Sequence, residues 1–239
     1  MPTLQVDAIL FDMDGTLVDS TPGVMKAWAT FAHDYALPSA AEVAHASHGR
    51  RLYDTLKEWC KIDDETKLQA EIVRFEDEVI KGGPVILPGA LELINQIQSL
   101  NEVSPSRWTI VTSATNVYTP KALAGCSIPF PPSGYVTSND VSRGKPLPDP
   151  YLAGAKKVNI DPSKCLVIED APSGINSAHA AGSKSLAVCT SHSRKAIIDS
   201  KCNPDFIVED LTRVSVKWVD GKLELDIDET PADSTILAN

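Results

Sequence analysis

The sequence VDAILFDMDGT occupies residues 6–16 and joins an apolar run to two acidic residues and a turn. The run VDAILF predicts a buried β-strand, and Asp14-Gly15-Thr16 predicts the turn that ends it. Gly15 lets the chain turn away sharply, so Asp12 and Asp14 are both expected to face the crevice beyond the strand. Open α/β sheets bind their ligands at this end of their strands. This segment therefore predicts both a sheet and the place of a functional site.

The rest of the chain alternates short apolar runs with segments of helical period. Nearly continuous apolar strands are typical of a parallel sheet that is covered on both faces. The alternation predicts an α/β fold with a doubly wound, mostly parallel, Rossmann-like sheet. Strands are expected at 108–112, 165–168, 186–188 and 206–208, and helices at 89–100 and 150–158.

One long segment interrupts this alternation. Between residues 21 and 85 there is no convincing strand, only amphipathic patterns such as Leu52, Leu56 and Trp59 on one helix face. We therefore predict a small, all-helical cap domain that is inserted after the first strand into the α/β core. The expected boundaries are 17–87 for the cap and 1–16 with 88–239 for the core.

The carboxyl-terminal part predicts a hairpin and a tail. Strand-like runs at 214–218 and 223–226 flank Asp220-Gly221, a dipeptide that is typical of tight hairpin turns. Residues 229–239 show no such pattern and are expected to be flexible.

Composition restricts the classes of partner and the compartment. The 239 residues include 32 Asp and Glu but only 22 Lys and Arg, which gives a formal charge of -10. This negative charge argues against binding to nucleic acid or to an anionic membrane. The five cysteines include no C-x-x-C pair, so a disulfide framework or zinc site is not expected. No apolar run approaches the roughly 18–20 residues of a membrane helix. We expect a cytoplasmic monomer without a membrane or nucleic-acid partner.

Polar groups follow three further predicted strands or loops. Ser113 and the amide of Ala114 lie where the 108–112 strand ends, a typical place for binding an anion. Lys145 stands between a glycine and a proline, just before a predicted helix. Glu169 and Asp170 end the apolar run at 165–168, as Asp12 and Asp14 end the first run. The sequence therefore predicts that anion-binding groups and carboxylates meet at one edge of the sheet.

Four converging carboxylates need a cation. At an effective dielectric constant near 20, each close pair of like charges costs about 4 kcal/mol. A hard cation removes this repulsion, and oxygen ligands with positions left for water and phosphate suit Mg²⁺. We therefore predict Mg²⁺ as the cofactor.

These motifs resemble those of the haloacid dehalogenase-like hydrolase superfamily of Mg²⁺-dependent phosphatases, in order and over essentially the whole chain. The matching residues are D-x-D-G-T at 12–16, Ser113, Lys145 and the pair Glu169-Asp170. The helical insert matches the cap of the subgroup whose cap follows the first motif. Within it, the chain resembles the fungal glycerol-phosphate and 2-deoxyglucose-6-phosphate phosphatases in Asn139-Asp140, Gly144-Lys145-Pro146, Asp149-Pro150-Tyr151 and His48-Gly49-Arg50-Arg51.

The resemblance implies a role for each matching residue. Asp12 is expected to be the nucleophile that forms an aspartyl-phosphate, and Asp14 the general acid and base. The implied phosphate ligands are Lys145, Ser113 and the amides of Met13 and Ala114. The implied Mg²⁺ ligands are Asp12, the main-chain carbonyl of Asp14, Asp170 and Glu169, the last either directly or through a water molecule.

The expected substrate is a small phosphorylated polyol or sugar, with glycerol phosphate as the first candidate. Arg51, and after it Arg50, is expected to contact phosphate or a substrate hydroxyl unless it is simply solvated. His48 adjoins Gly49-Arg50 and is the one histidine for which the sequence gives an argument. A sugar phosphomutase is the main alternative, and 2-deoxyglucose-6-phosphate or phosphoglycolate phosphatase activity is less favoured. Thr16, and the lack of a basic residue soon after Asp19, favour hydrolysis over phosphoryl return.

Overall fold

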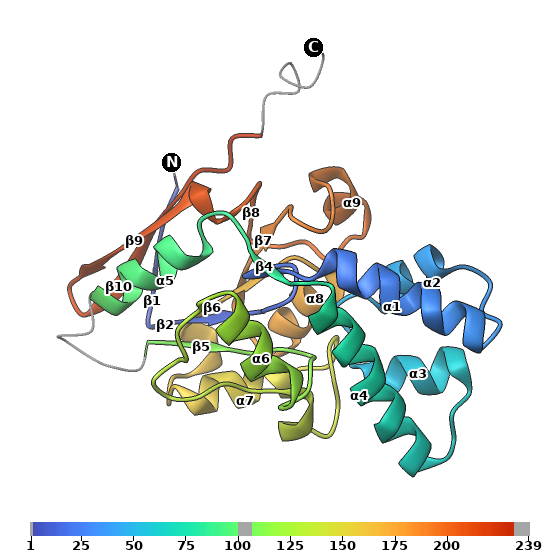
Figure 1. The fold of residues 1–239 in the computed structure, drawn as a ribbon. Coiled ribbons are helices and arrows are strands. Elements are labelled where there is room, and N and C mark those ends of the chain that lie inside the picture. Colours follow the sequence, from blue (N-terminus) through green and yellow to red (C-terminus); the bar gives the residue numbers. More distant parts are fainter. Residues whose placement is uncertain (1, 100–106, 232–239) are drawn as a thin grey trace.

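The computed structural model describes residues 2–99 and 107–231 and has a parallel sheet of five strands at its centre (Figure 1). The strand order is β5-β2-β6-β7-β8, which places the first motif on a central strand between β5 and β6. This confirms the predicted doubly wound α/β class. The bounds are β2 Ala8–Phe11, β5 Trp108–Ile110, β6 Cys165–Glu169, β7 Lys184–Val188 and β8 Phe206–Val208.

Helices cover both faces of this sheet because its buried strands are apolar on both sides. Along β2, Ile9 and Phe11 join one hydrophobic cluster, whereas Ala8 and Leu10 join another. The first cluster includes residues of α5 (Ala90–Ser99) and α6 (Tyr118–Gly125), and the second includes residues of α7 (Asp149–Lys157) and α8 (Pro172–Ala180). The remaining short helices are α9 (Arg194–Asp199) and the 3₁₀ turns Ser138–Asp140, Pro162–Lys164 and Leu211–Arg213.

The predicted first strand is wrong in one respect, because the run VDAILF belongs to two sheets. Its first residue ends β1 (Thr3–Val6), which pairs with β10 (Lys222–Ile227) in an antiparallel sheet of order β1-β10-β9. The chain changes sheet at Asp7, whose N–H donates to the carbonyl of Lys164 at 2.8 Å. The predicted hairpin is confirmed, since β9 (Val214–Val219) pairs with β10 around the turn.

The predicted flexible tail begins too early. The main-chain carbonyl of Glu229 accepts a hydrogen bond from Arg194 at 3.1 Å, and its carboxylate accepts the N–H of Ile207 at 2.9 Å. Glu229 is therefore fixed to β8 and α9. The rest of the predicted tail from residue 232 onward lies outside the described residues.

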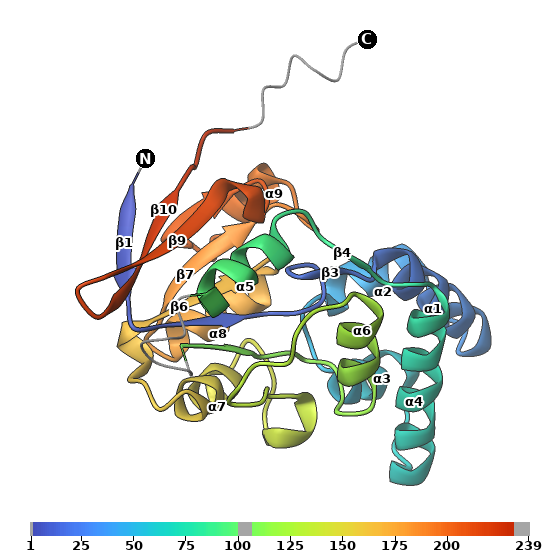
Figure 2. The same ribbon diagram turned by 60° about the vertical axis from the view of Figure 1, so that its left-hand side comes forward.

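Four helices between the first and second strands of the central sheet form one group beside the strand ends, at the right of Figure 1 and again in Figure 2. Their bounds are α1 Thr21–Asp34, α2 Ala40–Ser47, α3 Leu52–Cys60 and α4 Glu65–Lys81. Trp28, Phe31 and Phe75 pack edge to face where α1 meets α4. Where the chain leaves and returns, β3 (Val18–Asp19) pairs with β4 (Val85–Ile86). We call α1–α4 the cap; its boundary at 17–87 as a separate domain remains a prediction.

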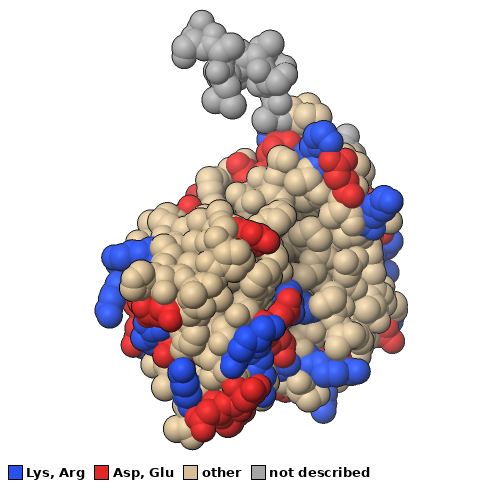
Figure 3. Space-filling view, turned by 90° about the vertical axis from the view of Figure 1, so that its right-hand side faces the viewer, with Lys and Arg blue, Asp and Glu red and all other residues tan. Residues whose placement is uncertain are grey.

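In the described parts of the chain, the helices and the face shown in Figure 3 include neither a membrane-spanning helix nor a strongly charged binding face. Among the described residues, no helix combines the length and apolar character that a bilayer crossing requires. On the face shown in Figure 3, acidic and basic side chains are interspersed, and they do not form a broad patch of one sign.

Candidate active site

The first motif sits at the carboxyl end of β2, directly beside the end of β6. The N–H of Asp12 donates to the carbonyl of Ile168 at 2.9 Å, which carries the strand pairing into the motif. Gly15 has a φ of +90°, and a Cβ there would lie 2.1 Å from Oδ2 of Asp170. Only glycine permits both this backbone conformation and the close approach. The turn therefore brings the acids of the two strand ends together, as expected.

Lys145 lies at the centre of these acids and is almost fully buried. Its Nζ atom donates to Oδ1 of Asp12 at 2.5 Å, to Oε1 of Glu169 at 2.7 Å and to the carbonyl of Val111 at 3.1 Å. Burial by itself lowers the pKa of this ammonium, but the two carboxylates raise it above its usual value. Lys145 therefore stays charged and joins the ends of three strands.

Glu169 is fully buried, and its carboxylate is saturated with hydrogen bonds. Oε1 accepts from Lys145 and from the hydroxyl of Tyr151 at 2.9 Å, and Oε2 accepts the N–H groups of Asp170 and Ala171 at 3.0 Å. A carboxylate has about four acceptor positions, so all are in use. Glu169 thus orients Lys145, and direct metal coordination would require it to give up one of these bonds.

Three buried carboxylates at the ends of β2 and β6 lie close enough together to suit a hard cation. Ligand oxygens of Asp12, Glu169 and Asp170 lie within 4.8 Å of one another, and all three residues are buried. Burial raises the pKa of Asp12 well above its usual value; Lys145 opposes this, and the neighbouring Glu169 and Asp170 add to it. An oxygen-only donor set fits Mg²⁺, whose charge would add to that of Lys145 in offsetting the repulsion among the three carboxylates. With Glu169 saturated, Asp12 and Asp170 are the carboxylates best able to bind it.

Asp14 lies apart from Lys145 and has a different environment. Its Oδ1 accepts a hydrogen bond from the hydroxyl of Tyr118 at 2.7 Å. Burial raises the pKa of Asp14, although hydrogen bonds from Ser20 and Tyr118 act in the opposite direction. A carboxyl with a raised pKa holds its proton more readily than an ordinary aspartate, as a general acid must. Tyr118 has no motif around it, so no pattern in the sequence indicated this residue.

A short cap segment contacts the core motifs directly. Nε2 of His48 lies 2.7 Å from Oδ2 of Asp170. Burial opposes protonation of His48, but the Asp170 carboxylate outweighs this effect and raises the pKa to about 9. The carbonyl of the next residue, Gly49, accepts from Oγ of Ser113 at 2.8 Å, and Oγ of Ser173 donates to the carbonyl of His48 at 3.1 Å. The hydroxyl expected to bind phosphate is therefore bonded to the cap.

Both arginines form ion pairs with acidic residues of α3, and contact of either one with phosphate or a substrate hydroxyl remains a prediction. Arg51 is turned away from the pocket, where its guanidinium binds Asp54 at 2.8 Å and the carbonyls of Val141 and Ser142 at 3.1 and 3.0 Å. Arg50 lines the pocket and binds Glu58 at 2.6 Å. Successive residues at the start of a helix point in different directions, which the sequence motif alone does not resolve.

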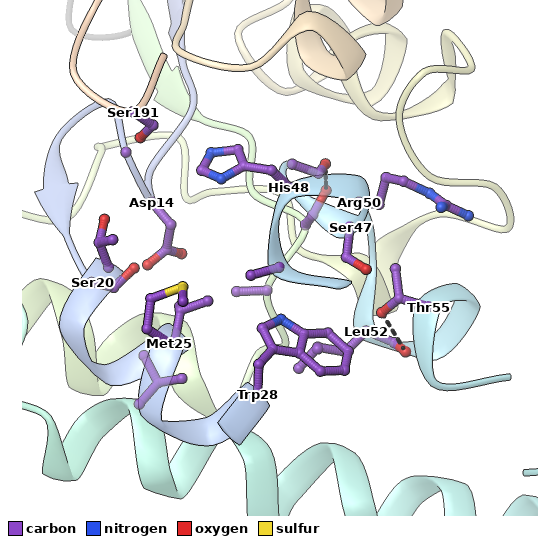
Figure 4. Close-up of a pocket in the computed structure, with 18 of the residues that line it drawn as sticks. Asp14, Ser20, Met25, Trp28, Ser47, His48, Arg50, Leu52, Thr55 and Ser191 are labelled. Atoms are coloured by element: carbon purple, nitrogen blue, oxygen red, sulfur yellow. Dashed lines mark hydrogen bonds between the residues drawn. The ribbon is translucent and has the colours of Figure 1, made fainter. Parts of the chain in front are cut away.

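These residues surround a pocket of about 370 Å³ between the core and the cap (Figure 4). On the core side the pocket is lined by the nucleophile candidate Asp12, by Asp14 and by Ser113-Ala114. Lys145, Glu169 and Asp170 do not line the pocket and are buried in the core. Met13 is buried and its carbonyl accepts from the N–H of Leu17 at 2.8 Å, which stabilises the turn of the motif. The cap side includes Val24, Met25, Trp28, Ser47, His48 and Glu76.

Two pocket residues were missed by the sequence analysis. Glu76 of α4 accepts from the N–H of Thr115 at 2.9 Å and also from its hydroxyl, and burial raises its pKa to about 7. The sequence did contain a signal for Glu76, because this acidic residue lies beside Phe75 and Val79 on the apolar face of α4. His192 packs at 4.9 Å from the ring of His48, and its Nδ1 lies 3.2 Å from the carbonyl of Asp170. No sequence pattern indicated His192.

A sequence model described as haloacid dehalogenase-like hydrolase matches residues 6–182 of this chain. The chain belongs to that family. It is 33% identical over 238 residues to glycerol-1-phosphate phosphohydrolase 1 of Saccharomyces cerevisiae, covering 95% of this chain and 90% of the relative. It is also 35% identical over 187 residues to hexitol phosphatase A of Escherichia coli, with coverages of 77% and 84%.

Solved structures agree with this family fold. β-Phosphoglucomutase from Clostridium difficile superposes with a TM-score of 0.71, 19% identity and coverages of 86% of this chain and 92% of that one. At this identity the likeness shows the fold alone. The family and the phosphatase relatives support a phosphoric monoester hydrolase, as the motifs predicted.

Proposed function

We propose that this protein is a Mg²⁺-dependent phosphatase that hydrolyses small polyol or sugar phosphate monoesters through an aspartyl-phosphate. The observation that carries this proposal is the arrangement around Asp12. Its carboxylate reaches the pocket while its Oδ1 accepts from the ammonium of Lys145, whereas Oδ1 of the neighbouring Asp14 accepts from the neutral hydroxyl of Tyr118. Two neighbouring carboxyl groups in different environments can divide the roles of nucleophile and acid.

The reaction then proceeds in two steps. The Asp12 carboxylate attacks phosphorus, an O–P bond forms, and the ester P–O bond breaks as Asp14 gives its proton to the leaving oxygen. In the second step Asp14 takes a proton from water, whose oxygen attacks phosphorus and releases phosphate from Asp12. Asp14 ends protonated and Asp12 ionised, so the pair is ready for the next ester.

The phosphoryl group is held by the residues that the family motifs indicate. Lys145 contributes a fixed positive charge, and the amides of Met13 and Ala114 donate hydrogen bonds. Ser113 joins them once its hydroxyl exchanges the carbonyl of Gly49 for a phosphate oxygen. This exchange couples phosphate binding to movement of the cap.

Mg²⁺ is assigned to Asp12, the main-chain carbonyl of Asp14 and Asp170, with Glu169 contributing through water. When bound, the ion supplies positive charge that offsets repulsion between the anionic phosphate and these carboxylates. Asp170→Asn tests this assignment, because the variant loses a proposed carboxylate ligand.

Glycerol phosphate and hexitol phosphates are the first esters to test, because the two relatives named above act on them. A sugar phosphomutase remains the alternative, since it requires the same Asp12 and Asp14. Phosphate release, compared with turnover of a sugar bisphosphate, separates the two activities. We retain a cytoplasmic location and a monomeric state as proposals, the latter to be measured by light scattering.

Asp12→Asn tests the proposed nucleophile. We expect phosphate release from every ester to fall to background, because the amide cannot form the acyl phosphate, while the circular dichroism spectrum stays that of the wild type. Asp19→Asn is a matched control, since within the described residues the one hydrogen bond to this carboxylate comes from the N–H of Thr21 at the start of α1. Turnover by Asp12→Asn at the rate of the control would refute the assignment.

A further inference from the structure

Two histidines from opposite sides of the pocket meet beside Asp170. His48 belongs to the cap segment between α2 and α3, whereas His192 follows β7 in the core. Their rings pack edge to face with centroids 4.9 Å apart, and Nε2 of His48 lies 2.7 Å from Oδ2 of Asp170. Figure 4 shows the ring of His48 pointing toward the core segment that carries Ser191. Nitrogen and oxygen ligand atoms of the cap and the core therefore come together at one place.

The ligand atoms of this cluster are close enough to share one ion. One ligand atom from each of His48, Asp170 and His192 lies within 4.8 Å of the other two. A tetrahedral zinc site, with Zn–N and Zn–O distances of about 2.0–2.2 Å, places neighbouring ligand atoms roughly 3.3 Å apart, so the side chains reach it with shifts on the order of 1 Å. Three protein ligands and one open position are a common arrangement for zinc in enzymes.

The orientation of His192 is that of a metal-binding histidine. Its Nδ1 lies 3.2 Å from the main-chain carbonyl of Asp170. A carbonyl only accepts, so Nδ1 is the donor, and the lone pair of the neutral ring lies on Nε2. Histidines that bind metals usually donate their other N–H to a carbonyl or a carboxylate, which fixes the ring. The loop after β7 thus holds an imidazole with one nitrogen left for an ion.

An ion can reach the cluster from the pocket. His48 and His192 both line the pocket and are half-buried, while Asp170 lies behind them and is 1% exposed. An ion pair with Asp170 requires only one imidazole, so it does not account for the second ring packed against the first. Two imidazoles and a carboxylate at a pocket wall are a donor set for a metal ion.

This donor set differs from that of the proposed Mg²⁺ site. Imidazole nitrogens suit Zn²⁺, Cu²⁺ and Ni²⁺, whereas Mg²⁺ prefers carboxylate, carbonyl and water oxygens. Asp170 belongs to both groups, because its ligand oxygen also lies within 4.8 Å of those of Asp12 and Glu169. The two kinds of cation therefore compete for one carboxylate.

We propose that His48, His192 and Asp170 form a binding site for a transition-metal cation of the Zn²⁺ class, and that this cation inhibits the protein. In binding, it takes Asp170 from Mg²⁺ and fixes the cap segment of His48 to the core. The binding does not depend on the proposed phosphatase function; only the inhibition rests on it. No spacing in the sequence indicates this site, because its residues come from three distant segments.

Titration of the EDTA-treated, dialysed full chain with Co²⁺ tests the site directly. Co²⁺ replaces Zn²⁺ in such sites and absorbs visible light strongly only when it is four-coordinate. We expect a strong absorption that saturates at a one-to-one ratio and disappears when Zn²⁺ is added. In His192→Ala and in His48→Gln this absorption is lost. Calorimetry then shows Zn²⁺ binding weakened at least about 100-fold, because loss of a ligand's outer partner alone costs about 10- to 100-fold.

His33→Ala is the matched control. His33 also lies next to a carboxylate, with Nδ1 3.1 Å from Oδ1 of Asp34, but it is exposed and belongs to no metal-binding group within the described residues. This variant is expected to keep the Co²⁺ absorption and the Zn²⁺ affinity of the wild type. An equal loss of Zn²⁺ affinity in His33→Ala and His192→Ala would indicate scattered surface binding and would overturn the site.

Competition connects the site to turnover. We expect the apparent dissociation constant of Zn²⁺ to rise in proportion to the Mg²⁺ concentration, and Zn²⁺ to stop phosphate release from glycerol phosphate. In His192→Ala, measured against its own rate without Zn²⁺, the same inhibition requires at least about 100-fold more Zn²⁺.

The opposite results are equally informative. A weak, six-coordinate Co²⁺ spectrum that is the same in the wild type and in His192→Ala places the ion at the carboxylates alone and overturns the site. Zn²⁺ binding that does not respond to Mg²⁺ overturns the competition for Asp170. If no ester is hydrolysed, the proposed function fails, and the Co²⁺ spectrum still decides whether the two histidines bind a metal.

Discussion

At the scale of single residues, the site depends on one buried acid that holds a lysine in place. Glu169 receives four hydrogen bonds and gives Lys145 its position against Asp12. A buried ion pair of this kind contributes little net stability, but loss of one partner leaves an uncompensated charge. Groups that fix Glu169 are therefore expected to affect turnover as strongly as residues that touch the substrate.

Gly174→Ala tests this dependence. A Cβ at Gly174 would lie 1.6 Å from Oε1 of Glu169, so the carboxylate has to move and Lys145 with it. We expect kcat to fall on the order of 100-fold, because a displacement of about 1 Å at a reacting group has that effect. Steady-state phosphate release measures it. Gly125→Ala is the control, since nothing lies within 4 Å of its added Cβ; equal activity of the two variants would contradict the role given to Glu169.

At the scale of elements, one face of α4 both packs against the other cap helices and contacts the core. Leu68, Ile72, Phe75 and Val79 bury it against the other cap helices, and Glu76 directs a carboxylate from the same face to Thr115 of the core. The helix is thus both the core of the cap and one of its links to the α/β sheet. An acid in this place lowers stability when it is ionised, which is consistent with a functional reason for keeping it.

Glu76→Gln makes that cost measurable as a pH dependence. In the folded protein the pKa of Glu76 is about 7, above the ordinary value of 4.5. The contribution of the neutral carboxyl to the free energy of unfolding is therefore fully present below pH 4.5 and is lost as the pH rises through 7. Relative to Glu76→Gln, the wild type is expected to lose on the order of 3 kcal/mol of unfolding free energy between pH 5 and 8. Urea denaturation at a series of pH values measures this. Asp77→Asn, which removes a neighbouring, half-buried acid paired with Lys121 at 3.2 Å, is expected to follow the wild type. Parallel curves for Glu76→Gln and the wild type would disprove the shift.

At the scale of the whole molecule, the cap and the core share the site. His48 and Gly49 of the cap contact Asp170 and Ser113 of the core, and Glu76 contacts Thr115. The core residues are those to which phosphate and metal binding are assigned. Binding at the core is therefore expected to change the stability and the position of the cap together.

Addition of Mg²⁺ tests this linkage in the full chain. A ligand at 100 times its dissociation constant stabilises the folded state by about 2.7 kcal/mol. We expect the melting temperature to rise with Mg²⁺ and not with K⁺ at equal ionic strength, and the rise to disappear in Asp170→Asn. Phosphate release is expected to stop in EDTA and to return with Mg²⁺. Full activity in EDTA together with an unchanged melting temperature would exclude the metal.

Much of this architecture was predictable because its signals are local. The apolar runs of β2, β6 and β7 and the turn at Asp220-Gly221 are each readable within a few residues. The pairing of β1 with β10 was not, because it joins residues at opposite ends of the chain and splits one apolar run between two sheets. Glu229 was missed for the same reason, since its partners Arg194 and Ile207 are distant in sequence.

The sequence by itself determined the α/β class, the helical insert and the acids, serine and lysine at the strand ends, because periodicity and motif spacing are properties of neighbouring residues. Only the tertiary structure decided which cap residues line the pocket. It turned Arg51 away, placed Arg50, Trp28 and Ser47 at the wall, and brought Glu76, Tyr118 and His192 to the motifs. The direction of a side chain on a docked helix depends on how the helix packs, and packing is set by contacts between segments that the linear sequence does not pair.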